Sequence, residues 1–207
     1  MTFYNSGVSI LSQLTTEIRI FVMNAQTNFI PVMKILSALW AVNILHWLSK
    51  NKLNALGIYP RQASGIIGIF FSWIPHQNFN HLFFNSIPLF ALLLFMTSFG
   101  WFTFWFSSIM IIILGGLAVW LFGRKACHIG ASGVILGFFG YVLASAYLHP
   151  TFTTFFLALV ALYYFGSMLL SIFPTQERVS WESHLLGLIA GIATLYLYPH
   201  VVSFLAS

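Results

Sequence analysis

The scarcity of charged residues is the strongest constraint on how this chain folds. Only 5% of its 207 residues are charged and 59% are hydrophobic. A soluble globular domain carries about 25% charged residues, so water could not solvate the surface that this chain would present. There is no Asp, and the only carboxylates are Glu17, Glu177 and Glu182. We therefore expect an integral membrane protein.

Apolar segments of membrane-spanning length recur along the chain. A bilayer core of about 30 Å needs roughly 20 apolar residues in helix. The segments that approach this length are residues 31–49, 80–98, 101–122, 131–148, 152–173 and 183–205. The first is the weakest, because Asn43 and His46 interrupt it. The pattern predicts an all-α membrane protein with six transmembrane helices in one bundle.

Two further segments are apolar but do not have the pattern of a span. Residues 8–23 are interrupted by polar residues such as Glu17 and Arg19, so we predict an interfacial helix there, within an N-terminal interfacial segment of residues 1–30. The loop 50–79 contains an apolar run that, as helix, reaches only about 13 Å. We expect this loop to be partly embedded in the membrane beside a six-span domain over residues 31–207.

Polar side chains converge on one membrane face. With six spans, the second, fourth and sixth begin on the same side of the bilayer. These starts carry His81 with Asn85, Ser132, and His184. Polar groups inside a membrane are costly, so their convergence from three helices indicates a functional site.

Ser132 lies in Gly130-Ala-Ser-Gly133 at the start of the fourth span. A helix N-terminus offers unpaired N–H groups and the positive end of the helix dipole, which suit an oxyanion. Flanking glycines let the backbone approach a substrate closely. Gly133 and Gly137 also form a GxxxG pair, and taken alone the motif is more typical of small residues that pack membrane helices.

His184 begins the sixth span, and Gly187 and Gly191 follow it on the same helical face. This face can pack on the glycines of the fourth span, backbone to backbone. We expect that contact to bring His184 within hydrogen-bond reach of Ser132. A single His at a helix end is usually structural, but two glycine faces that each follow a potential reactant favour a Ser–His pair.

His81 and Asn85 share one face of the second span. Both side chains can donate a hydrogen bond to a developing oxyanion, although an interhelical hydrogen bond that fixes packing is an equally good interpretation. His76 follows Pro75 and is more typical of a loop anchor than of a reactant. We assign no role to His46, His128, His149 and His200.

The residues that the chain lacks exclude several chemistries. Without Asp there is no aspartyl pair, and no HExxH motif is present to bind a catalytic zinc. We therefore predict no metal and no cofactor. We also predict no nucleic-acid partner, because the excess of Lys and Arg is scattered along the chain. A serine triad needs a carboxylate. We expect Glu182 to point away from His184, which leaves packing to orient the imidazole.

With these motifs in this order, the sequence resembles the rhomboid family of intramembrane serine proteases. The resemblance covers about residues 31–200. The matching pieces, in the family's order, are His76-Gln-Asn-Phe-Asn-His81-Leu-Phe-Phe-Asn85, Gly130-Ala-Ser132-Gly133, and His184-Leu-Leu-Gly187 with Gly191.

The resemblance implies that Ser132 is the nucleophile and His184 the general base. It implies an oxyanion hole made by His81, Asn85 and the Ser132 N–H, and substrates that are transmembrane helices of other proteins. It also implies a multi-pass protein of the cell membrane, in a bacterium the inner membrane. The family keeps the N-terminus cytoplasmic and opens its site outward, whereas the loop charges alone place the active face in the cytoplasm.

The chain departs from the family pattern at several positions. Leu136 stands where many members have a Tyr that stacks on the imidazole. An acidic residue near Thr97 and a Trp-Arg pair in the first loop are missing. We expect these changes to alter stability more than activity. The alternatives are a non-catalytic rhomboid-like protein that binds and routes membrane helices, and a small transporter or channel.

Overall fold

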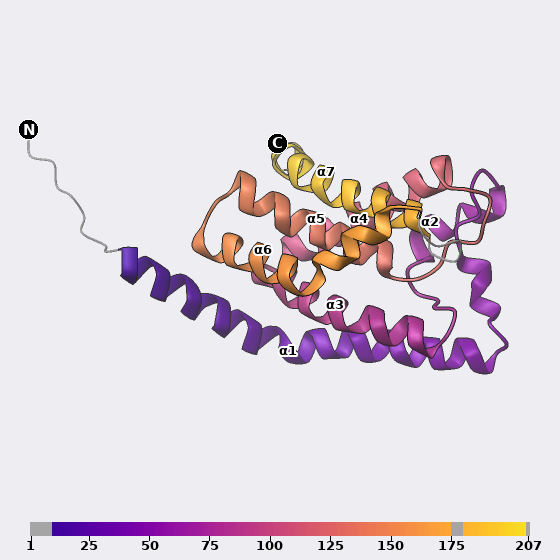
Figure 1. Ribbon diagram of the computed structural model, residues 1–207, viewed down its shortest axis with the longest axis horizontal. Helices are drawn as coiled ribbons and strands as arrows, with labels where there is room; N and C mark the ends of the chain where they lie inside the picture. Colours follow the sequence, from indigo (N-terminus) through magenta and orange to yellow (C-terminus); the bar gives the residue numbers. More distant parts are fainter. Residues whose placement is uncertain (1–9, 175–179, 206–207) are drawn as a thin grey trace, which may run out of the picture.

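The computed structural model describes residues 10–174 and 180–205 (Figure 1). Apart from one isolated backbone bridge between Ile58 and His128, the regular structure of these residues is helical. The α-helices are α1 Ile10–Leu48, α2 Gly68–Phe71, α3 Phe79–Ser98, α4 Trp101–Phe122, α5 Ser132–Leu148, α6 Phe152–Phe165 and α7 Trp181–Leu205. The 3-10 turns are η1 Lys52–Leu56, η2 Ala63–Gly65 and η3 Gly166–Ile172.

Several of these helices have the length and apolar character of membrane spans. Within the described residues, five segments qualify: Leu11–Leu48, Phe79–Ser98, Trp101–Phe122, Phe152–Ile172 and Trp181–Phe204. The apolar α5 has only 17 residues and extends over about 26 Å. The prediction of an all-α, multi-pass membrane bundle is therefore confirmed.

The first helix differs from the sequence prediction, which placed a boundary between an interfacial segment and a span near residue 31. Instead α1 is continuous for 39 residues, with Pro31 inside it. That length is about 58 Å, nearly twice the thickness of a bilayer core. A proline inside a helix tends to break it. Here the next residue, Val32, is fully buried, so packing against the bundle stabilises the helix on both sides of Pro31. The N-terminal part of α1 extends beyond the other helices (Figure 1).

The polar residues that weaken the first predicted span have structural partners. The Asn43 side chain donates to the carbonyl of Ile74 at 2.9 Å and accepts from the backbone N–H of His76 at 2.7 Å. His46 accepts at Nδ1 from the N–H of Leu53, at 3.2 Å. Both side chains are fully buried. They hold the beginning and the end of the loop that joins α1 to α3.

That loop packs on the bundle along much of its length. The backbones of Ile58 and His128 exchange two hydrogen bonds of 3.0 Å. Farther along, α2 lies against α4 so closely that a Cβ at Gly116 would be 2.6 Å from the carbonyl oxygen of Ile69. The large apolar side chains that stay exposed here are Ile66, Ile67, Phe70 and Phe71. That this loop is partly embedded in the membrane stays a prediction.

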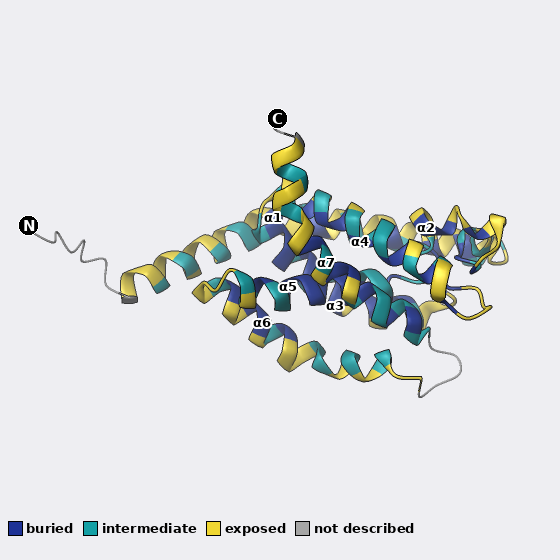
Figure 2. Ribbon diagram, turned by 90° about the horizontal axis from the view of Figure 1, so that it is seen from above, coloured by how far each residue is buried: buried dark blue, intermediate teal, exposed yellow. Residues whose placement is uncertain are grey.

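Helices α5 and α7 pack backbone against backbone at the centre of the bundle. A Cβ at Gly187 would overlap the carbonyl oxygen of Gly133, and a Cβ at Gly191 would overlap that of Gly137. Figure 2 shows α5 largely buried, whereas α6 and the start of α1 carry broad exposed faces. This contact fixes the register of the two helices, so their N-terminal ends lie side by side.

The first testable prediction concerns this glycine contact. Replacement of Gly191 by Ala should lower the free energy of unfolding by roughly 1–3 kcal/mol, because a methyl group overpacks the interface with Gly137. Gly115→Ala is the matched control, since its Cβ would be 3.6 Å from the Cβ of Ala190, an ordinary contact. Thermal unfolding in detergent measures both. Equal stability of the two variants would contradict the observed packing.

Candidate active site

Ser132 is the first residue of α5, and a sharply bent segment leads into it. Gly130 has a φ of +111°, a conformation that side chains disfavour. Its N–H donates to the carbonyl of Ser72 at 2.8 Å. A Cβ at Gly130 would be only 2.7 Å from Cε1 of His81. The bend therefore brings the His81 ring against the backbone just before Ser132.

The position of His81 follows from the start of its helix. Asn78 caps α3 by accepting a 2.9 Å hydrogen bond from the His81 N–H, as N-cap residues do. This places the imidazole in the first turn of α3, beside Gly130. Residues of α3, of the segment before α5, and of α7 thus meet at one end of the bundle.

His76 ties the loop before α3 to the same segment. Its Nδ1 lies 3.0 Å from the carbonyl of Ile74, which can only accept, so Nδ1 carries the proton. Its Nε2 then accepts from the N–H of Ala131, at 3.2 Å. The Trp47 indole donates to the His76 carbonyl at 2.9 Å, and the His76 and His81 rings pack edge to face. His76 is fully buried, and its contacts are those of an anchor for the residue before Ser132.

The ring of His184 is oriented by a backbone carbonyl. Its Nδ1 lies 3.1 Å from the carbonyl of Ser171 in η3, so Nδ1 carries the proton and Nε2 is left as a proton acceptor. Sequence reasoning expected packing alone to orient this ring. No sequence signal could identify the partner, because every residue has a carbonyl. As expected, Glu182 turns elsewhere, and its carboxylate accepts from the Arg124 N–H at 3.2 Å.

Ser132 and His184 lie at the same end of the tightly packed α5–α7 pair, but no hydrogen bond joins them within the described part of the chain. The predicted hydrogen-bond contact is therefore not formed here. His184 is tied to Ser171, whereas Ser132 lines a cavity together with Ser183 and Gly187. Catalytic hydrogen bonds are often long in unliganded enzymes and shorten in the complex with substrate.

Asn85 lies one helical turn after His81 and is 92% buried, with 8% of its surface exposed. Its Nδ2 has no hydrogen-bond partner among the described residues. An unpaired buried donor costs about 1–3 kcal/mol, so such groups are rare in native structures and need an explanation. The Asn85 amide is thus an unused hydrogen-bond donor one helical turn from His81.

A small cavity of about 40 Å³ adjoins the start of α5. That volume accommodates about three water molecules, on the order of 10–15 Å³ each. Apolar side chains of α4 form much of its wall, and polar groups that could hold water come from Ser72, His128, Ser132 and Ser183. Among the described residues, no group of three or more metal-binding side chains comes together.

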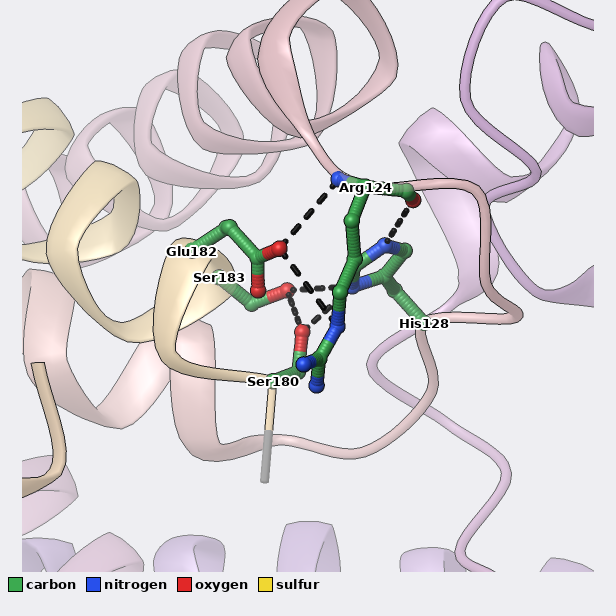
Figure 3. A network of polar contacts seen from close by, with 5 residues as sticks. All are labelled: Arg124, His128, Ser180, Glu182 and Ser183. Atoms are coloured by element: carbon green, nitrogen blue, oxygen red, sulfur yellow. Dashed lines mark hydrogen bonds and ion pairs between the residues drawn. The ribbon is translucent and has the colours of Figure 1, made fainter. Parts of the chain in front are cut away.

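Sequence reasoning missed a second polar cluster beside this cavity (Figure 3). It joins the loop between α4 and α5 to the first turn of α7 through Arg124, His128, Ser180, Glu182 and Ser183. His128 hydrogen-bonds to Ser180 through Nδ1, and the Ser180 and Ser183 hydroxyls are 2.7 Å apart. The two groups of residues, one on the loop and one on α7, are more than 50 positions apart in the chain and form no motif, so only the fold brings them together.

The second prediction follows from the burial of His76. Burial, and next the nearby His81, lower the pKa of His76 to about 4, from an ordinary value of 6.5. The stability that this neutral ring contributes is complete above pH 6.5 and is lost as the pH falls toward 4. Protonation would place a hydrogen on Nε2 and break its bond with the Ala131 N–H. The loss is at most about 3 kcal/mol.

Thermal unfolding in detergent at stepped pH values measures this loss. In His76→Gln the amide oxygen can still accept from Ala131 but cannot titrate, so the variant should lose less stability than wild type between pH 6.5 and 4. Histidines that do not contact His76 contribute equally to both proteins and cancel in the comparison. Identical pH profiles would show that His76 does not carry the effect.

Comparison with known proteins identifies the family. The family model for the Rhomboid domain matches residues 63–200. Two uncharacterized proteins, from Mycobacterium tuberculosis and Mycobacterium bovis, are each 34% identical over 175 residues, covering 80% of this chain and 73% of each relative. An uncharacterized protein of Mycobacterium leprae is 30% identical over 177 residues, covering 81% of this chain and 70% of that protein.

No solved structure matches the chain significantly. The region matched by the family model contains every residue of the candidate site described above, from His76 to His184. The chain therefore belongs to the rhomboid family.

Proposed function

We propose that this protein is an intramembrane serine endopeptidase that hydrolyses peptide bonds in or near transmembrane helices of other membrane proteins. One observation carries the proposal. The backbone contact of α5 with α7 places Ser132 and His184 at the same end of the bundle, and the Ser171 carbonyl leaves His184 Nε2 unprotonated. An imidazole in this state can accept a proton from a serine hydroxyl.

The proposed reaction uses groups of this chain at each step. His184 Nε2 accepts the proton of Ser132 Oγ as the oxygen attacks the substrate carbonyl. The imidazolium then gives this proton to the leaving amine as the peptide bond breaks. Water, supplied from the adjoining cavity, attacks the resulting ester and is deprotonated by His184 in the same way. The acid product leaves and Ser132 regains its proton.

The proposed oxyanion hole combines three donors. The Ser132 N–H is at the N-terminus of α5, where helix N–H groups are unpaired and the dipole favours negative charge. The His81 ring lies against Gly130, two residues before Ser132. The unpaired Asn85 amide, one turn further along α3, is the third. Donors that need no rearrangement stabilise the developing charge effectively.

We propose a six-span topology in which α1, α3, α4, α5, the α6–η3 unit and α7 cross the membrane. The shortness of α5 suits this role, because at about 26 Å it leaves Ser132 below the membrane surface. A helix end within the bilayer is tolerated where protein surrounds it, as it does here. A bacterial cell membrane fits the mycobacterial origin of the relatives.

The third prediction tests the proposed pair of reactants. Wild-type protein in detergent should react with a fluorophosphonate probe and cleave a single-span substrate in liposomes. Both Ser132→Ala and His184→Ala should abolish both activities, because each lacks one of the two reactants. The matched controls are Ser145→Ala, a buried serine of the same helix, and His149→Ala, an exposed histidine. Labelling that survives in Ser132→Ala would refute the proposed nucleophile.

The same experiment separates the alternatives. A non-catalytic protein that binds membrane helices would leave the probe unreacted in wild type. A transporter or channel would move solute or ions across the liposome membrane, and Ser132→Ala would not stop it.

The fourth prediction separates catalysis from stability at Asn85. Asn85→Leu should lower kcat roughly 10²- to 10³-fold, as the loss of an oxyanion donor does. It should leave the thermal unfolding temperature unchanged or raised, because the amide that it removes has no partner. Asn43→Leu is the contrasting variant, since its amide bonds to Ile74 and to His76 and its loss should destabilise the fold. Destabilisation by Asn85→Leu would show a structural role instead.

A further inference from the structure

The loop between α4 and α5 is fastened to the first turn of α7 by the cluster of Figure 3. The His128 ring bonds to Ser180 through Nδ1 and lies 3.4 Å from the Ser183 hydroxyl through the same nitrogen. Beside it, the Glu182 carboxylate is 3.5 Å from Nε of Arg124. The loop ends just before Ser132, and the first turn of α7 includes His184. The cluster therefore links the backbone before Ser132 to the backbone at His184.

In each hydrogen bond of the His128 ring, the donor and the acceptor can be assigned. His128 Nε2 lies 3.0 Å from the carbonyl of Arg124, which can only accept, so Nε2 carries the ring proton. Nδ1 is then an acceptor, and the Ser180 hydroxyl donates to it. The Ser183 hydroxyl can donate in turn to Ser180, at 2.7 Å. The neutral ring thus joins a carbonyl of the loop to two hydroxyls of α7.

Backbone hydrogen bonds hold the residues at both ends of this connection, His128 on the loop and Ser180 at the start of α7. On the loop side, the His128 backbone is paired with Ile58 by two hydrogen bonds. On the α7 side, the N–H of His184 donates to the carbonyl of Ser180 at 3.2 Å, within the first helical turn. A shift of Ser180 or Ser183 would therefore move His184 relative to Ser132.

We propose that His128 is a positioning residue, which sets the first turn of α7 through Ser180 and Ser183 and so places His184 for reaction with Ser132. This inference rests on the proposed protease function. The Arg124–Glu182 link adds to the same fastening but is less directional, because the Arg124 side chain is 39% exposed and exposed ion pairs contribute little. The His128 residue, by contrast, is only 3% exposed, and its ring bonds to both sides of the connection.

A competing interpretation is that His128 only holds water, because both His128 and Ser183 line the cavity near Ser132. The two roles act on different steps. Water is consumed when the ester is hydrolysed, whereas reaction of Ser132 with a fluorophosphonate consumes none. A positioning residue therefore changes the rate of labelling, and a water-holding residue changes turnover alone.

Two substitutions at His128 provide a matched pair for the test. The amide oxygen of His128→Asn lies near the place of Nδ1 and can still accept from Ser180, but the link to the Arg124 carbonyl is lost. The amide of His128→Gln lies near the place of Nε2 and keeps that link, but the link to α7 is lost. Each variant removes one hydrogen bond of the ring, so their losses of stability should be similar.

The experiment measures fluorophosphonate labelling of the full chain in detergent, as the maximal rate and the half-saturating probe concentration, with thermal unfolding alongside. We expect His128→Gln to lower the maximal rate roughly 10- to 100-fold, the cost of a small misplacement of a reactant, at an unchanged half-saturating concentration. His128→Asn should label at close to the wild-type rate. Ser180→Ala should resemble His128→Gln.

Each remaining outcome overturns the inference. Wild-type rates in both His128 variants would show that the link to α7 does not position His184, and slower turnover with normal labelling would indicate the water-holding role. If both His128 variants label more slowly, each in proportion to its loss of stability, the role of His128 is purely structural. Absence of labelling in wild type would refute the proposed function itself. The failure of the positioning role alone is distinguished from this by labelling that occurs in wild type and is abolished in Ser132→Ala.

Discussion

The contact between the backbones of α5 and α7 is the interaction on which the rest of this structure depends. Lipid provides no hydrophobic force that drives helices together, so close packing of small residues must hold them. Glycine at positions 133, 137, 187 and 191 leaves no side chain where the two backbones come closest. The register of two helices that touch in this way cannot slip, and it places the starts of both helices at one end of the bundle.

A second theme is the use of backbone carbonyls to orient buried imidazoles. Three buried histidines, His76, His128 and His184, each donate one ring N–H to a carbonyl, from Ile74, Arg124 and Ser171. Since a carbonyl only accepts, each contact fixes the tautomer and leaves the other nitrogen as an acceptor. In a chain without Asp, neutral dipoles thereby orient imidazoles without the cost of a buried charge.

Comparison of sequence and structure shows where pattern reasoning was sufficient. The bounds of the helices after the first were predicted to within a few residues, because apolar runs between polar breaks need no knowledge of neighbours. The first helix was predicted less well. Glu17 interrupts its apolar pattern, yet its carboxylate accepts two hydrogen bonds from Thr153 at the start of α6. A polar residue that weakens a span in the sequence can thus be a tertiary contact in the fold.

The sequence by itself determined the class of the protein, the helices, the glycine faces and the small set of polar residues available for chemistry. These follow from composition and from helical periodicity, which are local properties. Only the tertiary structure decided that Asn85 has an unpaired amide, that Ser171 orients His184, and that His128 joins the loop before Ser132 to the helix of His184. These contacts link residues distant in the chain through carbonyls and hydroxyls that no motif distinguishes, so the packing of the helices alone selects them.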